Sequence, residues 1–151
     1  MTARVLALAA ISDRIGVVFL IEGQLKDWMT SETGAFSNVA AAGHTQELIN
    51  RYRPDVVLTE QIAPNCQKAP ATIGLIKAMA RTAERNEVLD VMVPRVQRYA
   101  NKYEEAAALA EIYPALAPRV PAKRKYYDHQ PRSLVIFEAL ALAHSIRSEA
   151  A

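Results

Sequence analysis

The stretch Asp55-Val-Val-Leu-Thr-Glu60 is a short apolar run that ends in a glutamate. Apolar runs of this length are typical of strands that a sheet buries on both faces. Arg53-Pro54 precedes the run and ends a helix predicted over Asn38–Tyr52, with Ser37 as its N-cap. Because a helix between two strands forms a crossover, we expect the strand over 55–59 to lie parallel to the first strand of the chain.

Three strands are predicted before that helix. Val5–Ile11 and Gly16–Ile21 are continuous apolar runs, and Leu25–Thr30 is more amphipathic and therefore nearer an edge of the sheet. The short polar segments between them read as tight turns, so the three strands should form an antiparallel meander. The helix that follows is expected to place four residues in the core: Val39, Leu48, Ile49 and Tyr52.

After the 55–59 strand the pattern alternates between helix and strand. We predict helices over Ala71–Arg85 and Lys102–Ile112, a strand over Val88–Val93, and a last helix from about 132 to 148. Residues 63–70 and 115–130 are expected to be loops. The predicted order is a single α/β domain over residues 1–151, with a five-stranded mixed sheet (three antiparallel strands, then parallel strands) and helices on both faces. This is the order of the ribonuclease H-like fold.

Composition excludes several classes of protein. The chain has 151 residues, of which 51% are hydrophobic and 23% charged, as in globular proteins. No apolar stretch is long enough to cross a membrane, so no membrane association is expected. Cys66 is the sole cysteine, which excludes an internal disulfide and predicts a reducing, cytoplasmic location.

Positive charge is concentrated in one window of the chain. Residues 95–132 hold eight basic and four acidic residues, a net charge of +4, whereas the whole chain has +2. Five of the six tyrosines lie in the same window. Basic charge interleaved with aromatic rings suits a polyanionic partner. The alternative interpretation is a solvated face with tyrosines packed beneath it.

Two glutamates stand in apolar surroundings. Glu138 is the only polar residue between Leu134 and Ala143, and Glu60 ends a strand expected to be parallel. A charge buried alone costs several kcal/mol unless it is paired, protonated or bound to a metal. Ligand sites in open α/β sheets lie at the carboxyl ends of parallel strands, which places Glu60 just past such an end. The alternatives are a polar residue opening a loop at Glu60, and a side chain that reaches solvent at Glu138.

Several segments, in their order along the chain, resemble the RuvC-type Holliday-junction resolvases of the ribonuclease H-like superfamily. Val5-Leu-Ala-Leu followed by Gly16 resembles the first hairpin of that family, and Asp55–Gln61 resembles the fourth strand with its catalytic glutamate. Lys102-Tyr-Glu-Glu-Ala106, Pro121-Ala-Lys-Arg-Lys125 and Ile136–Ala143 resemble the segments that lead into and form the last helix.

The resemblance implies hydrolysis of DNA phosphodiesters with Mg²⁺, or Mn²⁺ in its place, held by carboxylates. Glu60 and Glu138 would be the metal ligands and catalytic residues. Branched or duplex DNA would be the substrate. Because resolvases of this family act as dimers, the resemblance also implies a homodimer. The nucleic-acid-binding residues would be those of the basic window: Arg98, Lys102, Lys123, Arg124 and Lys125.

This chain departs from the family pattern at the metal site. Ala9 stands where the family carries its first aspartate, and Glu138 stands where it carries its last. Val135 occupies a position that holds an acid or a histidine in many resolvases, and Asp13, in the following turn, is a candidate substitute ligand. Three hypotheses follow: a Mg²⁺-dependent endonuclease with a depleted site, a catalytically inactive DNA-binding relative, and a protein-interaction module on the same fold.

Overall fold

The computed structural model describes residues 3–96, 98–121, 131 and 133–150. Five strands form one sheet in the order β3-β2-β1-β4-β5. Their bounds are β1 Arg4–Ile11, β2 Arg14–Ile21, β3 Gln24–Ser31, β4 Val56–Gln61 and β5 Leu89–Pro94. Strands β1, β2 and β3 pair antiparallel, whereas β4 lies parallel to both β1 and β5. The predicted mixed sheet, with its meander and its crossover, is confirmed.

The first hairpin is tighter than predicted. Strand β2 begins at Arg14 and not at Gly16, because the β1–β2 ladder continues to the pair formed by Ile11 and Arg14. Only residues 12 and 13 are left for the turn. Arg14 is 8% exposed and forms an ion pair with Glu32, so a charged residue starts a strand that the apolar pattern alone placed two residues later.

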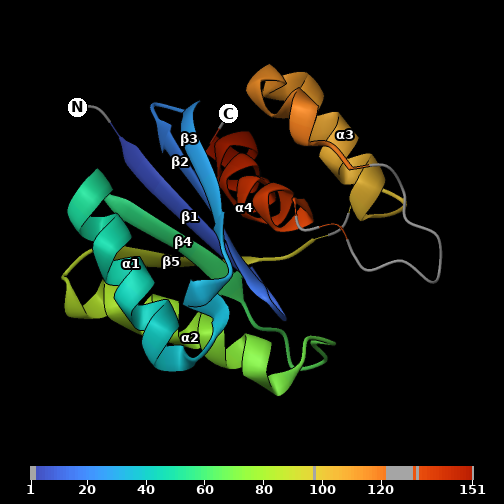
Figure 1. The fold of residues 1–151 in the computed structure, drawn as a ribbon. Helices are drawn as coiled ribbons and strands as arrows, with labels where there is room; N and C mark the ends of the chain where they lie inside the picture. Colours follow the sequence, from blue (N-terminus) through green and yellow to red (C-terminus); the bar gives the residue numbers. More distant parts are fainter. Residues whose placement is uncertain (1–2, 97, 122–130, 132, 151) are drawn as a thin grey trace.

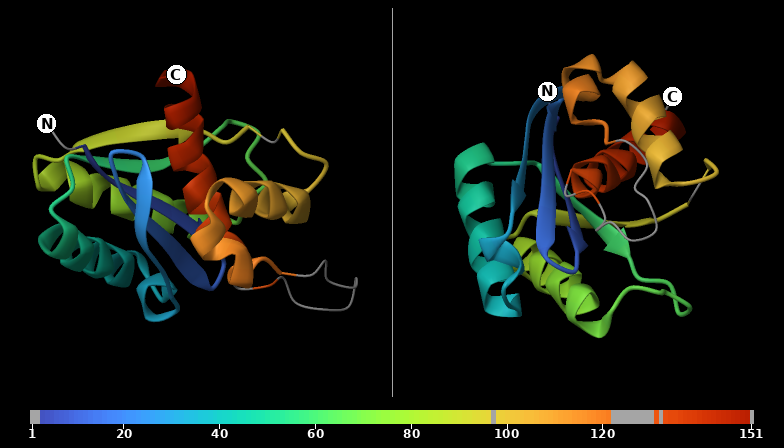
Figure 2. Two further views of the ribbon diagram at one scale, coloured as in Figure 1. Left: turned by 90° about the horizontal axis from the view of Figure 1, so that it is seen from above. Right: turned by 45° about the vertical axis from the view of Figure 1, so that its right-hand side comes forward.

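Helices cover both faces of the sheet, as Figures 1 and 2 show. Helices α1 (Asn38–Tyr52) and α2 (Pro70–Arg85) pack on one face, while α4 (Leu134–Ala150) crosses the other. Helix α3 (Lys102–Ile112) packs against α4 on the side away from the sheet. The last helix is therefore enclosed between two layers, and residues 134–140 are buried on every side of it.

The prediction that Val39 of α1 lies in the core is wrong. Val39 is 82% exposed, because the buried residues of this helix start at Ala41 and continue through Thr45, Leu48, Ile49 and Tyr52. At 3.6 residues per turn, Val39 lies on the side of the helix opposite to Leu48. The prediction for Leu48, Ile49 and Tyr52 is confirmed, and Ser37 caps the helix by accepting a hydrogen bond from the Ala40 N–H.

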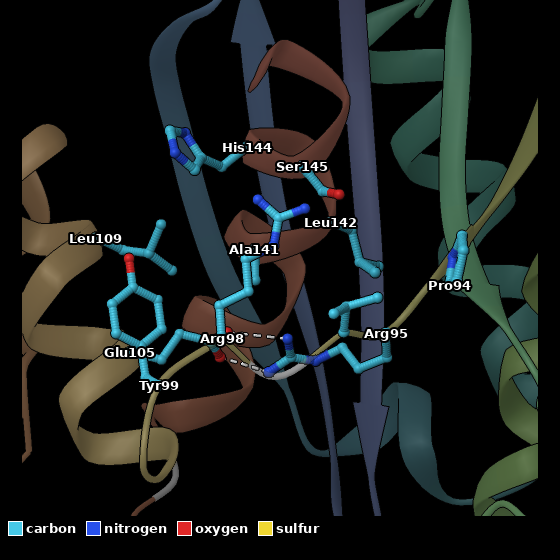
Figure 3. A pocket seen from close by; sticks show the side chains of 11 residues that line it. Pro94, Arg95, Arg98, Tyr99, Glu105, Leu109, Ala141, Leu142, His144 and Ser145 are labelled. Atoms are coloured by element: carbon cyan, nitrogen blue, oxygen red, sulfur yellow. Dashed lines mark hydrogen bonds and ion pairs between the residues drawn. The ribbon is translucent and has the colours of Figure 1, made fainter. Parts of the chain in front are cut away.

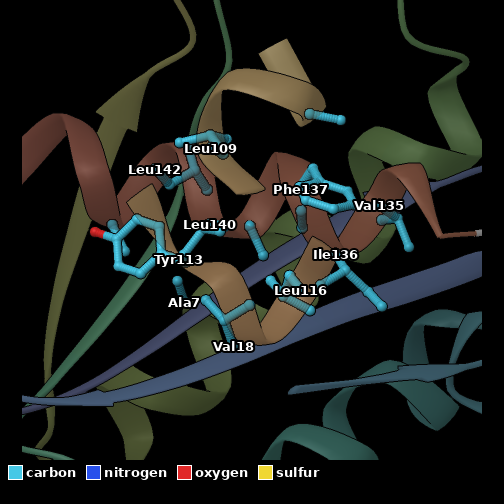
Figure 4. Packing of buried hydrophobic residues seen from close by; sticks show 14 of the residues in the cluster. Ala7, Val18, Leu109, Tyr113, Leu116, Val135, Ile136, Phe137, Leu140 and Leu142 are labelled. Carbon is cyan, nitrogen blue, oxygen red and sulfur yellow. The ribbon is translucent and has the colours of Figure 1, made fainter. Parts of the chain in front are cut away.

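Part of the predicted 115–130 loop is ordered as a 3₁₀ helix, η2 (Pro114–Arg119), and a shorter one, η1 (Thr33–Ala35), follows β3. Leu116 in η2 is completely buried. It fills the core beside Phe137 and Leu140 of α4, as Figure 4 shows, so hydrophobic burial stabilises a segment that its prolines marked as irregular. Within the described residues, no helix is both long and apolar enough to span a bilayer.

A glycine brings α4 against the sheet. A Cβ atom added at Gly16 of β2 would lie 2.3 Å from the carbonyl oxygen of Val135, in the first turn of α4. No other residue type fits at this contact without moving one of the two backbones. Side chains of β1 and β2, including Ala7, Ala9 and Val18, complete the core beneath the helix.

Candidate functional site

Glu60 lies inside β4, one residue before its end. The expectation that it follows the strand is wrong by two residues, because β4 continues to Gln61 and Glu60 pairs with Val93 of β5. Alternation along the strand puts Glu60 on the same face as Leu58, which belongs to the core beneath α4. The side chain is therefore directed to the face that α4 covers, and the residue is only 8% exposed.

Glu138 reaches the same region from α4. It is 4% exposed, at the end of the helix that Gly16 holds close to β2. Since residues 134–140 are buried on every side of the helix, no polar stripe is available to Glu138, and its carboxylate needs partners inside the protein. The partners are two lysines, one from the loop after β4 and the other from the start of α3.

Lys68 joins the two glutamates. Its Nζ atom lies 3.5 Å from Oε1 of Glu60 and 3.5 Å from Oε2 of Glu138, and it donates a hydrogen bond of 3.0 Å to the carbonyl oxygen of Ala10. One ammonium group is thus shared by β4, α4 and the end of β1. The lysine side chain is 21% exposed, so most of it lies within the protein.

Lys102 is the second partner of Glu138. Its Nζ atom lies 2.8 Å from Oε1, at the start of α3, and its side chain is 44% exposed. Burial raises the pKa of the Glu138 carboxyl, but the charges of Lys68 and Lys102 outweigh burial, and the pKa is lowered from its ordinary value. Glu138 is therefore held in its ionised form by two cations.

A further ion pair lies beside these three. The guanidinium of Arg95, just after β5, binds both carboxylate oxygens of Glu105 in α3, with Nη1 3.0 Å from Oε2. Burial lowers the pKa of Arg95, yet its hydrogen bonds and ion pair with Glu105 prevail, and the pKa is raised. A bidentate ion pair of this kind fixes the orientation of both side chains and anchors α3 to the end of β5.

All of these charged groups except Glu105 line one cleft of about 720 Å³. Its walls come from the end of β4, the loop through residues 61–68, the end of β5, α3 and α4. Next to it, a smaller pocket of about 90 Å³ separates the segment after β5 from α3 and α4. Arg98 and Tyr99 line that pocket together with Arg95 and His144, as Figure 3 shows. Arg98 is exposed.

The residues present do not fit a carboxylate-held metal ion. Among the described residues, no three His, Cys, Asp or Glu side chains gather closely enough to hold one. Asp13 is exposed in the β1–β2 turn and does not join Glu60 and Glu138 in such a group, while Ala9 lies buried in the core beneath α4. The place between the two carboxylates is taken by the ammonium of Lys68. One feature favours cation binding: the buried Oε2 of Glu138 accepts no hydrogen bond in the described structure, so it keeps a free acceptor position.

Of the proposed nucleic-acid-binding residues, Arg98 and Lys102 lie along this cleft and the adjoining pocket. Lys123, Arg124 and Lys125 lie outside the described residues. Sequence reasoning missed Lys68 and the pair formed by Arg95 and Glu105. The available signal for Lys68 was indirect: two glutamates in apolar surroundings require a cation, and Lys68 is the only lysine between Glu60 and the next helix.

Comparison with solved structures identifies the class of fold. The sheet order and the helices on its two faces are those of the RuvC-like, ribonuclease H-like α/β fold. RuvC of Thermus thermophilus superposes with a TM-score of 0.63 at 16% identity, covering 99% of this chain and 96% of that one. The fowlpox virus resolvase, solved with Holliday junction DNA, gives a TM-score of 0.61 at 12% identity, covering 96% of this chain and 99% of that one.

A second Thermus thermophilus RuvC structure, in complex with a Holliday junction substrate, gives a TM-score of 0.59 at 14% identity over 98% of this chain and 96% of that one. No family model matches the chain, and no curated protein matches its sequence. At these identities the likeness establishes the fold: this chain has the architecture of the Holliday junction resolvases.

Proposed function

We propose that this protein binds branched or duplex DNA on the cleft side of the fold and does not hydrolyse it. The observation that carries the proposal is the ion-pair network of the cleft, in which Lys68 and Lys102 neutralise the carboxylates that would otherwise bind metal. Hydrolysis by two metal ions needs carboxylates with open coordination positions. Here those positions face ammonium groups.

DNA binding is supported by charge and by the fold. Arg98 is exposed beside the cleft, and Lys102 stays 44% exposed although it pairs with Glu138. The wider 95–132 window has a surplus of four positive charges. Cationic groups that replace the counter-ions of phosphates provide most of the affinity for a nucleic acid. Two of the solved structures with this fold hold Holliday junction DNA. The homodimer implied by the resemblance stays a prediction, which light scattering can check.

The binding test compares two triple variants of equal charge. Lys123→Ala, Arg124→Ala and Lys125→Ala together remove three positive charges from the basic window. Lys77→Ala, Arg81→Ala and Arg85→Ala remove three exposed charges from α2, which packs on the face of the sheet away from α4. Fluorescence anisotropy with a labelled four-way junction should show at least a roughly tenfold loss of affinity for the first variant, with a shallower salt dependence. The α2 variant should retain most of its affinity.

Failure to bind the junction at low salt would contradict DNA binding and favour the protein-interaction hypothesis. Equal losses in the two triple variants would contradict binding through the basic window, since binding would then depend on overall charge alone.

A metal-dependent endonuclease is the second candidate, because Glu60 and Glu138 are both buried around one cation position. The same junction, incubated with Mg²⁺ or Mn²⁺, should remain uncut by the wild-type protein. Cleavage that is lost in Glu60→Gln, while folding and DNA affinity are kept, would overturn our proposal and establish the endonuclease.

A further inference from the structure

We infer that Lys68 is a built-in counter-ion that keeps divalent cations out of the cleft, and that removing its charge converts the cleft into a site for a hard divalent ion. The inference concerns the same carboxylates as the proposed function. It rests on the proposed function only in assuming that the wild-type protein does not cleave DNA. Ion binding by the cleft can be measured without DNA.

The position of the ammonium group carries the first step. Nζ of Lys68 contacts Glu60 and Glu138 at equal distances of 3.5 Å, and its hydrogen bond to the Ala10 carbonyl fixes it over the end of β1. Three elements that are distant in sequence therefore converge on one cation. Two of the contacting groups are carboxylates and the third is a carbonyl, and all three supply the oxygen atoms that Mg²⁺ and Mn²⁺ prefer.

The balance of charge carries the second step. Glu60 and Glu138 are 8% and 4% exposed, so water screens their mutual repulsion poorly. Lys102 lies 2.8 Å from Oε1 of Glu138, whereas Oε2 lies 3.5 Å from Lys68 and accepts no hydrogen bond from the described residues. Without the charge of Lys68, Glu138 would keep Lys102 on Oε1, whereas its under-coordinated Oε2 and the buried Glu60 carboxylate would lose the cation that they share. Binding a cation relieves that arrangement.

The ammonium group of Lys68 competes with a divalent ion for the same place. An ammonium group and a metal ion cannot occupy the same small space, and a divalent ion placed beside the lysine would meet a like charge within a few ångström. The wild-type cleft should therefore have little affinity for Mg²⁺ or Mn²⁺.

The test uses Lys68→Met, which keeps much of the side-chain volume and removes the charge. Lys77→Met is the matched control, because Lys77 is exposed on α2. Isothermal titration with MnCl₂, without DNA, should show at least about tenfold tighter binding by Lys68→Met than by the wild type or Lys77→Met. Mn²⁺ should also raise the melting temperature of Lys68→Met, because a ligand that binds only the folded state stabilises it. The other two proteins should melt at the same temperature with Mn²⁺ as with EDTA.

Two further variants keep the test decisive. Lys68→Arg retains the charge and should remain as unresponsive to Mn²⁺ as the wild type. If Lys68→Met is too unstable to titrate, Lys68→Gln replaces it, since the glutamine amide can still donate to the Ala10 carbonyl. Wild-type binding of Mn²⁺ as tight as that of the neutral variant would overturn the inference, as would no gain in either neutral variant. Neither outcome depends on DNA binding, so the two proposals fail separately.

Discussion

Gly16 determines the height at which α4 lies above the sheet. Its Cα approaches the Val135 carbonyl so closely that an added methyl group would lie 2.3 Å from the oxygen. The atoms that obstruct it belong to the helix backbone, so no rotation of a side chain can relieve the overlap. Because Glu138 lies less than one turn further along α4, this contact also sets the depth of its carboxylate in the cleft.

Gly16→Ala should therefore lower the free energy of unfolding by about 1–3 kcal/mol or more, as expected for overpacking in a rigid core. Gly43→Ala is the matched control: Gly43 is exposed within α1 and an added Cβ meets nothing within 4 Å. This substitution should stabilise the protein by about 0.5–1 kcal/mol, since alanine favours the helix. Urea denaturation measures both, and a neutral effect of Gly16→Ala would contradict the close packing of α4.

Glu138 should make stability depend on acid pH. Its pKa is lower in the folded protein than its ordinary value, so the ionised carboxylate stabilises the fold above about pH 4.3, the ordinary glutamate value. The contribution is lost as the pH falls through the folded-state pKa. The free energy of unfolding, measured by denaturation at a series of pH values, should decline as the pH falls from the ordinary glutamate pKa through the lower pKa of the folded state.

Glu138→Gln should decline less steeply over the same range, because the titrating group is gone. Glu111→Gln, at an exposed position of α3, controls for the loss of a glutamate in general. A wild-type slope in Glu138→Gln would show that other groups govern the acid response.

At the scale of single residues, sequence analysis found the two glutamates and missed the cation between them. The glutamates were recognisable because each interrupts or ends an apolar run. Lys68 lies in a segment with no periodic pattern, and nothing local indicates in which direction a loop side chain extends. Its position depends on β1, β4 and α4 coming together, which is a property of the tertiary structure.

Helix α3 begins with a capped turn beside the cleft. Its N-cap, Asn101, accepts hydrogen bonds of 3.0 Å from the N–H groups of Tyr103 and Glu104. The first turn of the same helix carries Lys102 and Glu105, the partners of Glu138 and Arg95. Fraying of this turn would separate both ion pairs.

Asn101→Ala should cost about 1 kcal/mol of stability and also weaken junction binding, because it loosens the turn that carries Lys102. Ser37→Ala removes the corresponding cap of α1, where the side chain accepts from Ala40, and should cost a similar amount without changing DNA affinity. Thermal denaturation and anisotropy compare the two. An equal loss of affinity in both variants would contradict a specific role for the start of α3.

Most elements were predictable because their patterns are local. Strands β1, β2 and β4 each contain an apolar run, and α1 follows a serine that caps it. The errors arose where tertiary contacts decide. Leu116 is buried in a segment whose prolines predict irregular structure, and Glu60 extends β4 because β5 continues beside it to Pro94.

Considered as a whole, the molecule brings the charged groups of the cleft to one end of the sheet. The carboxyl ends of β1, β4 and β5 all lie there, because these three strands are parallel. Helix α4 closes the space from one face, and the loop that carries Lys68 closes it from the β4 side. The location of such a cleft follows from the strand order and was predictable, whereas its balance of charges depends on side-chain directions.

The ammonium group of Lys68 is attached to the chain by covalent bonds, and this distinguishes it from any ion that the cleft could take from solution. A dissolved ion occupies a site only in proportion to its concentration, and chelators or depletion remove it. A tethered cation cannot be diluted, exchanged or withdrawn. The buried glutamates are therefore compensated from the moment the chain folds, whatever the supply of metal in its surroundings.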